Sequence, residues 1–399
     1  MGSIPAPATG GVYLPWGNGC RARASGLGVS PSPSAPPLLT AEKTALRRPR
    51  AERVITVVPR AGETLADVVR HLAKELRECE AVIGLMMVYG AVAARDQLEG
   101  LLVYELGPVD WPVLYVEGAG CANPVLAGIQ VFALDRREPL QRIMRHERVV
   151  GTVFCDDDAR HCLLGGLAPA DPTAARPEQA QNFFEAAQDA LQHGGFAYGD
   201  LARTWFYNDD ILAWYGDFNR VRTAFYARQA FHSGSVPAST GIRGRNPHRT
   251  ALTFAGWAVI PTGGRAAVRE VASPLQGPAP AYGSSFSRAM EIISGGWKRL
   301  LISGTASIAP DGKTLWAGDT RKQIDQTMAV VEAILRSRKM TLGDTTRATA
   351  YFKHAGEAGL FTEWCAARAL GRLPVVAVHA DICRADLQFE IELDAAVPV

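Results

Sequence analysis

The sequence predicts a mixed α/β fold in which strands alternate with amphipathic helices and part of the pattern is repeated. Near the end of the chain, Leu387, Phe389, Ile391 and Leu393 alternate with polar residues at the period of two that a β-strand imposes. Further upstream, a helix-turn-strand pattern occurs twice. At 399 residues and 47% apolar content, the chain is long enough to bury a large core around such elements.

The composition changes along the chain in a way that predicts its domains. Residues 1–51 are rich in Pro, Gly and Ser, and we expect them to form a disordered extension. The remainder is predicted to form an N-terminal domain at 52–272 and a C-terminal domain at 281–399. The Pro/Gly/Ala-rich stretch at 273–280 is the expected linker between them.

Charge and cysteine content exclude several functional classes. The formal net charge is +2, from 42 basic and 40 acidic residues, which argues against a nucleic-acid binder held by a basic face. No stretch of 18 apolar residues is present, so we expect no membrane span. Seven cysteines without a CxxC pair fit reduced thiols and therefore a cytoplasmic protein.

The internal repeat becomes visible when the chain is shifted by 144 residues. Gln179–Tyr207 then lies on Gln323–Tyr351 without a gap, and each copy is predicted to be a helix, a Gly-Asp turn and a strand. Second helices are expected to follow at 210–229 and 357–370. The two copies therefore predict two domains of similar construction.

The last strand also has a weaker copy upstream, and the two differ in their acidic residues. When Leu252–Ile260 is placed on Leu387–Ala395, Ala255 stands where Glu390 is. If Glu390 does chemistry, the chain has one working acid. The alternative is that Glu390, Glu392 and Asp394 simply form a solvated face of the strand.

The segment Arg203–Tyr226 combines aromatic and basic residues. Arg203, Trp205 and Tyr207 share one face of the predicted strand, which suits an anionic, planar and partly apolar ligand. Arg220, on the helix that follows, is a further candidate cation, and Arg347 and Tyr351 repeat the strand pattern. The alternative is that the aromatic rings belong to the core.

Two other segments contain residues that commonly form sites. Ser303, Gly304 and Thr305 follow a buried strand, where hydroxyls and backbone donors could bind an oxygen atom, although a simple tight turn explains them equally well. Cys155–Cys162 contains thiol, carboxylate and imidazole groups, but their spacing matches no zinc signature. No glycine-rich fingerprint is present, so we predict neither a metal nor a cofactor.

Short motifs in the second half resemble the Rid/YjgF family across 281–399. They are Phe286-Ser287-Arg288-Ala289, Ser303-Gly304, Gly343-Asp344 and Glu390-Ile391-Glu392. The arginine that such domains carry after a proline is absent, because Pro374 is followed by Val375. This departure argues against the imine deamination of that family.

Together with RTWFYNDDILAWYGDFNRVR and CRADLQFEIELD, these motifs resemble the chorismatase family over 52–399. The resemblance implies two Rid/YjgF-like (chorismate-mutase-like) domains of the α/β class (α+β), each a mixed sheet with helices packed on one face. It also implies a site for chorismate in the cleft between the domains, without a cofactor.

The resemblance further implies roles for individual residues. The first Glu of the closing motif is the family's general acid, and this is Glu390. A cysteine seven residues before the acid, here Cys383, resembles the branch that forms 3-hydroxybenzoate, and Gly296 falls near a second position of that branch. Cys383 would shape the pocket or exclude water, although it could equally be a small buried apolar residue. The predicted substrate-binding residues are Arg203, Tyr207, Arg220, Gly296, Ser303, Gly304, Thr305, Arg347 and Tyr351.

The predicted function is that of a chorismatase, a hydrolase or lyase of secondary metabolite biosynthesis. It would cleave the enolpyruvyl ether of chorismate to pyruvate and 3-hydroxybenzoate after protonation of the enol methylene. One alternative is hydrolysis to 3,4-dihydroxycyclohexa-1,5-diene carboxylate and pyruvate, and another is a non-catalytic Rid-like metabolite-binding protein. We expect a small-molecule partner only, and a monomer or a homotrimer.

Overall fold

The structure, a computed structural model, describes residues 41–45, 52–137 and 139–399. The expected disordered extension at 1–51 therefore lies largely outside the described residues. Its described part, Ala41–Ala45, is strand β1, which pairs with the next strand of the chain. Within the described residues, no helix is both long and apolar enough to cross a membrane.

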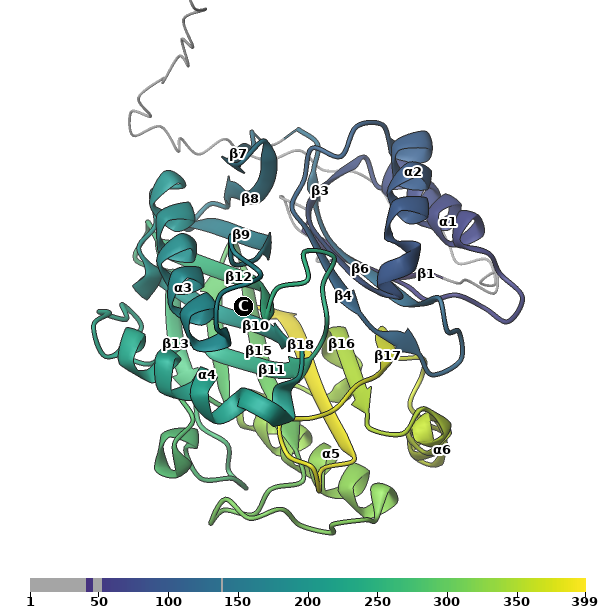
Figure 1. The fold of residues 1–399 in the computed structure, drawn as a ribbon, viewed down its shortest axis with the longest axis vertical. Coiled ribbons are helices and arrows are strands. Elements are labelled where there is room, and N and C mark those ends of the chain that lie inside the picture. Colours follow the sequence, from purple (N-terminus) through teal and green to yellow (C-terminus); the bar gives the residue numbers. More distant parts are fainter. Residues whose placement is uncertain (1–40, 46–51, 138) are drawn as a thin grey trace, which may run out of the picture. The chain divides into compact units, whose positions relative to one another are not determined.

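The described chain forms three mixed sheets, each accompanied by two helices (Figure 1). We call these groups module 1, module 2 and module 3. The elements of module 1, in sheet order β1-β2-β6-β3-β4, are β2 (Arg53–Val57), β3 (Ala81–Gly90), β4 (Val113–Glu117) and β6 (Leu126–Asp135), with helices α1 (Leu65–Glu78) and α2 (Arg95–Leu106).

Modules 2 and 3 follow along the chain. Module 2, in order β11-β10-β12-β9-β8-β7, contains β7 (Gln141–Arg145), β8 (Arg148–Cys155), β9 (Ala159–Leu167), β10 (Leu201–Asn208), β11 (Ala238–Arg243), β12 (Leu252–Pro261), α3 (Arg176–His193) and α4 (Ile211–Tyr226). Module 3, in order β13-β14-β15-β18-β16-β17-β5, contains β13 (Ala267–Val271), β14 (Ala289–Ser294), β15 (Trp297–Ala306), β16 (Thr345–Phe352), β17 (Val375–His379), β18 (Phe389–Pro398), α5 (Thr320–Ser337) and α6 (Ala358–Ala367), and its edge is extended by β5 (Ala119–Gly120).

The same topology occurs in all three modules. The strand after the first helix pairs in parallel with the strand after the second helix, as in β3 with β4, β10 with β11 and β16 with β17. On its other side it pairs with the last strand of the module in antiparallel fashion. The sequence suggested two such units, and the structure has three.

Each sheet has one face towards a shared core and the other towards its own helices. The shared core takes side chains from all three sheets, including Met87, Trp205 and Tyr351. Each sheet also has a separate core between it and its own two helices, which makes three further cores. In α3, for example, Phe183, Phe184, Ala187 and Leu191 recur at three and four residues and form the buried stripe. The predicted α/β class, with mixed sheets and helices packed on one face, is confirmed.

The predicted domain boundaries correspond only loosely to the modules. The range 52–272 contains two sheets, and β13 pairs with β14 of module 3 ahead of the expected linker at 273–280. The chain from Pro37 to Val399 forms one compact unit. The boundaries therefore remain predictions.

Three buried tyrosines mark equivalent positions in the modules. The hydroxyl of Tyr207 is 2.9 Å from that of Tyr89 and 2.9 Å from that of Tyr351. Their partners across the sheet are Gly128 for Tyr89, Thr253 for Tyr207 and Glu390 for Tyr351. The counterpart of Glu390 in module 2 is therefore Thr253.

This register corrects the comparison of the last strands made from sequence. Sequence similarity placed Ala255 opposite Glu390 because it matched Phe254 with Phe389. The sheet instead makes Phe254 equivalent to Ile391, since each lies one residue after the partner of the tyrosine. Ala255 consequently corresponds to Glu392. The expectation of a single acid at this place is unaffected, because Thr253 has no carboxyl group.

Candidate active site

A cavity of about 720 Å³ lies where module 2 meets module 3. One wall is formed by α4 and β11, and the other by β15, β18 and the loops before β14 and β18. Its lining includes Tyr215, Arg220, Arg222, Phe286, Arg288, Gly304, Cys383, Arg384 and Glu390. The cavity thus combines several arginines with one carboxyl group.

Glu390 is held against the backbone of the neighbouring strand. It lies on β18, is 4% exposed and borders the cavity beside Gly304 of β15. A Cβ atom on residue 304 would overlap Oε1 of Glu390. The absence of a side chain at Gly304 therefore lets the carboxyl of Glu390 occupy this position.

Burial keeps the carboxyl group of Glu390 protonated at neutral pH. Its pKa is raised to about 8, first by burial and then by the negative charge of Glu392. The positive charges of Arg203 and Arg288 oppose this shift without cancelling it. Glu390 therefore has the properties of a general acid.

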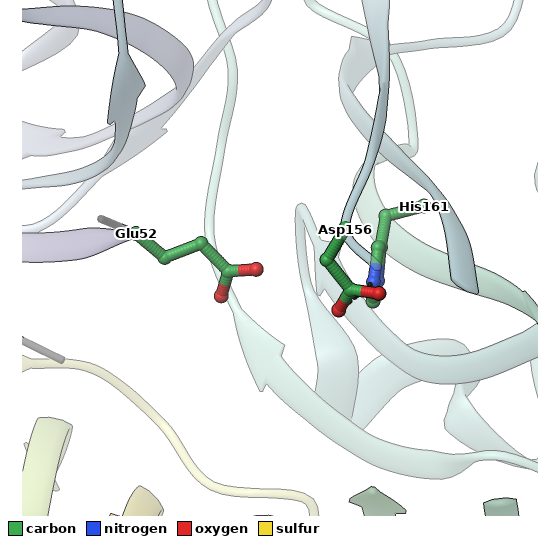
Figure 2. A group of neighbouring side chains, drawn as sticks. All are labelled: Glu52, Asp156 and His161. Atoms are coloured by element: carbon green, nitrogen blue, oxygen red, sulfur yellow. Dashed lines mark hydrogen bonds and ion pairs between the residues drawn. The ribbon is translucent and has the colours of Figure 1, made fainter. Parts of the chain in front are cut away.

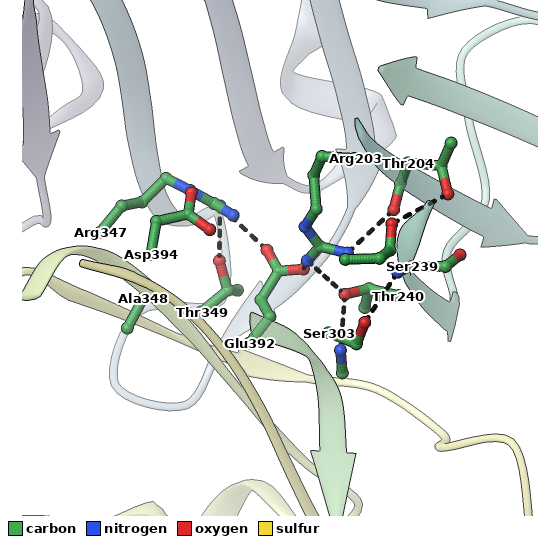
Figure 3. Close-up of polar contacts among 12 residues, drawn as sticks. Arg203, Thr204, Ser239, Thr240, Ser303, Arg347, Ala348, Thr349, Glu392 and Asp394 are labelled. Carbon is green, nitrogen blue, oxygen red and sulfur yellow. Dashed lines mark hydrogen bonds and ion pairs between the residues drawn. The ribbon is translucent and has the colours of Figure 1, made fainter. Parts of the chain in front are cut away.

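Glu392, two residues along the same strand, is in the opposite protonation state. Its two oxygens accept hydrogen bonds from Arg203 at 2.7 Å and from Arg347 at 2.9 Å (Figure 3). Burial alone would raise the pKa of Glu392, but the two guanidinium groups outweigh it and the pKa lies below its usual value. Adjacent carboxyls on one face of β18 thus hold different charges.

The ion pairs of Glu392 belong to a network that joins all three modules. Arg347 also donates to Asp394 at 2.9 Å and to Gln130 of module 1 at 2.8 Å. Arg203 of module 2 donates to Thr240 at 2.7 Å. The carboxylates of β18 are all buried, so the alternative of a solvated face is wrong.

Arg222 is the most unusual cation of the cavity. It lies on α4, is 1% exposed and contacts the rings of Phe206 and Phe218. Its Nη2 donates to Asn219 at 2.7 Å, whereas its Nε has no acceptor. Among the described residues, no carboxylate forms an ion pair with it. A buried guanidinium without a counter-ion is costly, so an anionic ligand in the cavity would satisfy it.

The other arginines of the cavity are partly engaged by the protein. Arg288 is 4% exposed and donates two hydrogen bonds to the carbonyl oxygen of Gly277. Arg384 donates to the carbonyl oxygen of Gly312 at 2.6 Å. Arg220 is largely exposed and pairs with Asp217. The positive charge of the cavity therefore comes from four arginines, Arg220, Arg222, Arg288 and Arg384.

Cys383 lies beside the acid as a neutral thiol. It lines the cavity, is half-buried and packs against the shared core. Burial, followed by the nearby Glu390, raises the pKa of its thiol to about 12. Because a nucleophilic cysteine needs a thiolate at working pH, this placement suits a role in shaping the pocket.

Several residues that the sequence suggested as substrate ligands do not line this cavity. Arg203, Tyr207, Arg347 and Tyr351 are fully buried in the network and core behind Glu390. This position favours their holding Glu392 and the strands in place over direct contact with a substrate. Their binding role remains a prediction.

The remaining predicted ligands are also placed by the structure. Ser303 is fully buried, donates to the carbonyl oxygen of Ser287 and accepts from the backbone N–H of Ser239 at 2.8 Å. Thr305 donates to the carbonyl oxygen of Ser303. Gly296 lies in the turn between β14 and β15 with φ of 76°, away from the cavity lining. Of the nine predicted substrate ligands, Arg220 and Gly304 line the cavity.

The segment Cys155–Cys162 contributes to a separate polar group, in which Asp156 and His161 lie near Glu52 (Figure 2). Trp257 donates its indole N–H to Nδ1 of His161, so Nε2 carries the proton that it gives to Asp156 at 3.0 Å. Arg299 donates to both oxygens of Glu52. In this arrangement the imidazole has no free lone pair for a metal ion.

Sequence reasoning missed Arg222, although the sequence contains a signal for it. Trp214, Phe218, Arg222 and Phe225 recur at four, four and three residues, so Arg222 lies on the buried stripe of α4. Arg220 faces largely outward on the same helix. An arginine within an apolar stripe is the more informative of the two because its charge requires a partner.

The pKa of Glu390 predicts how stability depends on pH. In the unfolded chain this group would ionise near its ordinary value of 4.5, whereas the folded protein keeps the proton up to about pH 8. The native state therefore binds more protons in this window, and its stability falls as pH rises, by about 1.4 kcal/mol per pH unit. Glu390→Gln removes this dependence. In urea unfolding measured between pH 5 and 8, the free energy of unfolding of the variant should rise relative to that of the unmodified chain as the pH is raised. If the difference between the two free energies did not change with pH, the assignment would be contradicted.

No family model and no curated protein matches the sequence. The structure is similar to that of a chorismatase, with a TM-score of 0.62, 20% identity, and coverage of 86% of this chain and 98% of that chain. Shorter matches include a Rid-family protein from Yersinia pestis (20% identity, 33% and 100% coverage, TM-score 0.28) and the YjgF protein from E. coli (19%, 32% and 96%, 0.25), whose scores are too low to argue from. The resemblance predicted from the motifs is confirmed for the fold, and the chain has the fold of chorismatase.

Proposed function

We propose that this chain is a chorismatase that converts chorismate to pyruvate and 3-hydroxybenzoate. The observation that carries the proposal is a protonated carboxyl, Glu390, facing a cavity in which the buried Arg222 has no counter-ion. The fold shared with chorismatase supports it.

The cavity suits a small dianion. Chorismate carries two carboxylates on one unsaturated ring, and guanidinium groups bind carboxylates with two parallel hydrogen bonds. Arg222 is the primary candidate because its charge is buried and lacks an ion-pair partner among the described residues. Arg288 and Arg384 are nearby candidates for the second carboxylate. Tyr215 and Phe286 supply flat surfaces for the ring.

The first chemical step is protonation of the enol ether. Glu390 gives its proton to the terminal methylene carbon of the enolpyruvyl group, which leaves an oxocarbenium ion on the substrate and a carboxylate on the protein. Arg203 and Arg288, which lower the pKa of Glu390, stabilise the carboxylate as it forms. A pKa of about 8 keeps the acid protonated at neutral pH and still strong enough to react.

The second step determines the product. The ring hydroxyl next to the ether attacks the ring carbon that carries the enolpyruvyl oxygen, and pyruvate departs with the proton from Glu390. The bond between the hydroxyl oxygen and its original ring carbon then breaks. The carbon that now carries the hydroxyl loses its hydrogen as a proton, the ring aromatises, and this proton restores Glu390. Chorismate is thereby divided into pyruvate and 3-hydroxybenzoate without consumption of water. In the hydrolytic alternative, water attacks the oxocarbenium carbon and a diene diol remains. The first course assigns to Cys383, whose neutral thiol lines the same cavity as Glu390, the role of excluding this water.

Product analysis tests both the activity and the branch. Incubation of the purified chain with chorismate should release pyruvate and 3-hydroxybenzoate in equal amounts, measured by chromatography. Glu390→Gln should lower kcat by about 10²- to 10⁴-fold, the usual contribution of general acid catalysis. The kcat/KM of the unmodified chain should fall above about pH 8, where Glu390 loses its proton.

The other outcomes of this experiment are equally informative. A dominant diene diol would reject the 3-hydroxybenzoate branch while keeping the acid. Binding of chorismate without pyruvate release would identify a metabolite-binding protein. Full activity of Glu390→Gln would reject the mechanism.

Arg222 gives a second prediction, with Arg220 as its matched control on the same helix. Arg222→Gln should raise the KM for chorismate by about tenfold or more, because a charge-assisted pair with a carboxylate is lost. Its thermal midpoint should not fall, since the variant removes an unpaired buried charge. Arg220→Gln, whose guanidinium is exposed and paired with Asp217, should raise KM less. Equal effects of the two substitutions would contradict the role given to Arg222.

A further inference from the structure

A second cavity, of about 530 Å³, lies between module 1 and module 2. Its lining contains Thr253, the counterpart of Glu390, and Gly166. Gly166 corresponds to Gly304 by the register of the sheets. Phe254 and Ile391 are equivalent, Phe254 pairs with the residue after Gly166, and Ile391 pairs with the residue after Gly304. The second cavity therefore occupies the place in module 2 that the candidate active site occupies in module 3.

The opposite walls of the two cavities also correspond. In the candidate active site this wall comes from α4 and β11, the second helix of module 2 and the strand that follows it. In the second cavity it comes from α2 and β4, the second helix of module 1 and the strand that follows it. Leu98 and Leu102 of α2 and Tyr115 of β4 give this wall an apolar part beside the charged Arg95 and Glu99 of α2.

The third equivalent place is filled. Gly128 stands where Glu390 and Thr253 stand in the other modules, and a Cβ atom on it would lie 2.9 Å from a methyl group of Val376. Side chains from β17 thus occupy this junction. The fold does not force an open cavity at every junction, so the opening between modules 1 and 2 is a specific feature of these residues.

Polar groups in the second cavity lack partners of the kind that a ligand would supply. Arg148 lies 2.9 Å from Nε2 of His248, and among the described residues no carboxylate pairs with it. Burial, with the charges of Arg148 and Arg95, lowers the pKa of His248 to about 4, so the imidazole is a neutral acceptor. The indole N–H of Trp111, a residue 6% exposed, has no acceptor among the described residues.

The other two arginines of this cavity have nearby opposite charges, whereas the exposed Glu147 lines the cavity without an ion pair among the described residues. Arg95 pairs with Glu99 at 2.6 Å, and Arg142 lies 3.7 Å from Asp110. Among the described residues, the exposed Arg148 is therefore the arginine of this cavity without a carboxylate partner, and Trp111 has a buried donor without an acceptor. Because Thr253 cannot deliver a proton as a carboxylic acid does, this cavity has no counterpart of the general acid.

We propose that the second cavity is a non-catalytic binding site for a small planar ring carboxylate. The carboxylate would accept hydrogen bonds from Arg148 and Trp111, and the ring would pack against Leu98, Leu102 and Tyr115. The second cavity lies at the junction equivalent to that of the candidate active site and has Thr253 in the place of Glu390. The inference does not depend on the reaction proposed above.

Benzoate is a suitable probe, with the indole N–H of Trp111 as the reporter. In nitrogen-15 NMR spectra of the full chain, the Trp111 signal, identified by its loss in Trp111→Phe, should move in a saturable manner as benzoate is added. Arg148→Gln should weaken this binding by about tenfold or more. The matched control is Arg145→Gln on the neighbouring strand, where Arg145 pairs with Asp189 outside the cavity, and it should leave the titration unchanged.

Arg222→Gln separates the two cavities. The Trp111 titration should persist in this variant, because Arg222 lines the other cavity. Absence of a Trp111 shift at millimolar benzoate, or a shift that Arg148→Gln leaves unchanged, would overturn the proposal. A shift that disappears in Arg222→Gln would also overturn it, since the probe would then bind in the candidate active site.

Discussion

The candidate site depends on the carboxylate of Glu392, which is held between Arg203 of module 2 and Arg347 of module 3. With Asp394 as the second acid, the buried cluster contains two cations and two anions. Removing one member of such a cluster leaves an uncompensated buried charge, which costs about 3–5 kcal/mol. The cluster therefore holds module 2 and module 3 together. It also places the negative charge of Glu392 two residues from Glu390. Burial, followed by the negative charge of Glu392, makes Glu390 hold its proton.

The three modules share one topology but differ in the residue at the position of Glu390. The place of Glu390 is taken by Thr253 at the second junction and by Gly128 at the third. Where the acid is present, the junction is a cavity that is also lined by Arg222 and Arg288. Where threonine is present, the cavity has no counterpart of Glu390, and where glycine is present, Val376 fills the space. Because the backbone is the same in each case, the chemistry follows from a few side chains at equivalent positions.

Much of the fold and part of the site could be predicted from the sequence. The period of β18 and the repeat containing Tyr207 and Tyr351 gave the sheets and helices of modules 2 and 3. The sequence did not predict module 1 as a third copy of the repeat. In module 1, Leu85 stands at the position of Arg203, so the arginine that the other two copies share is absent. Family resemblance identified Glu390 and Cys383, which both line the cavity. Strand periodicity cannot show whether a polar face meets water or another sheet, and for this reason Arg203 and Arg347 were expected to bind substrate, whereas they pair with Glu392.

Infrared spectroscopy can measure the protonation state of Glu390, on which this account of the site depends. An infrared difference spectrum between the unmodified chain and Glu390→Gln at pH 7 reports the C=O stretch of a protonated carboxylic acid. This band should be present at pH 7 and should disappear with a midpoint near pH 8 as the pH is raised. Its absence at pH 7, with the carboxylate band in its place, would show that Glu390 is ionised and would contradict the account.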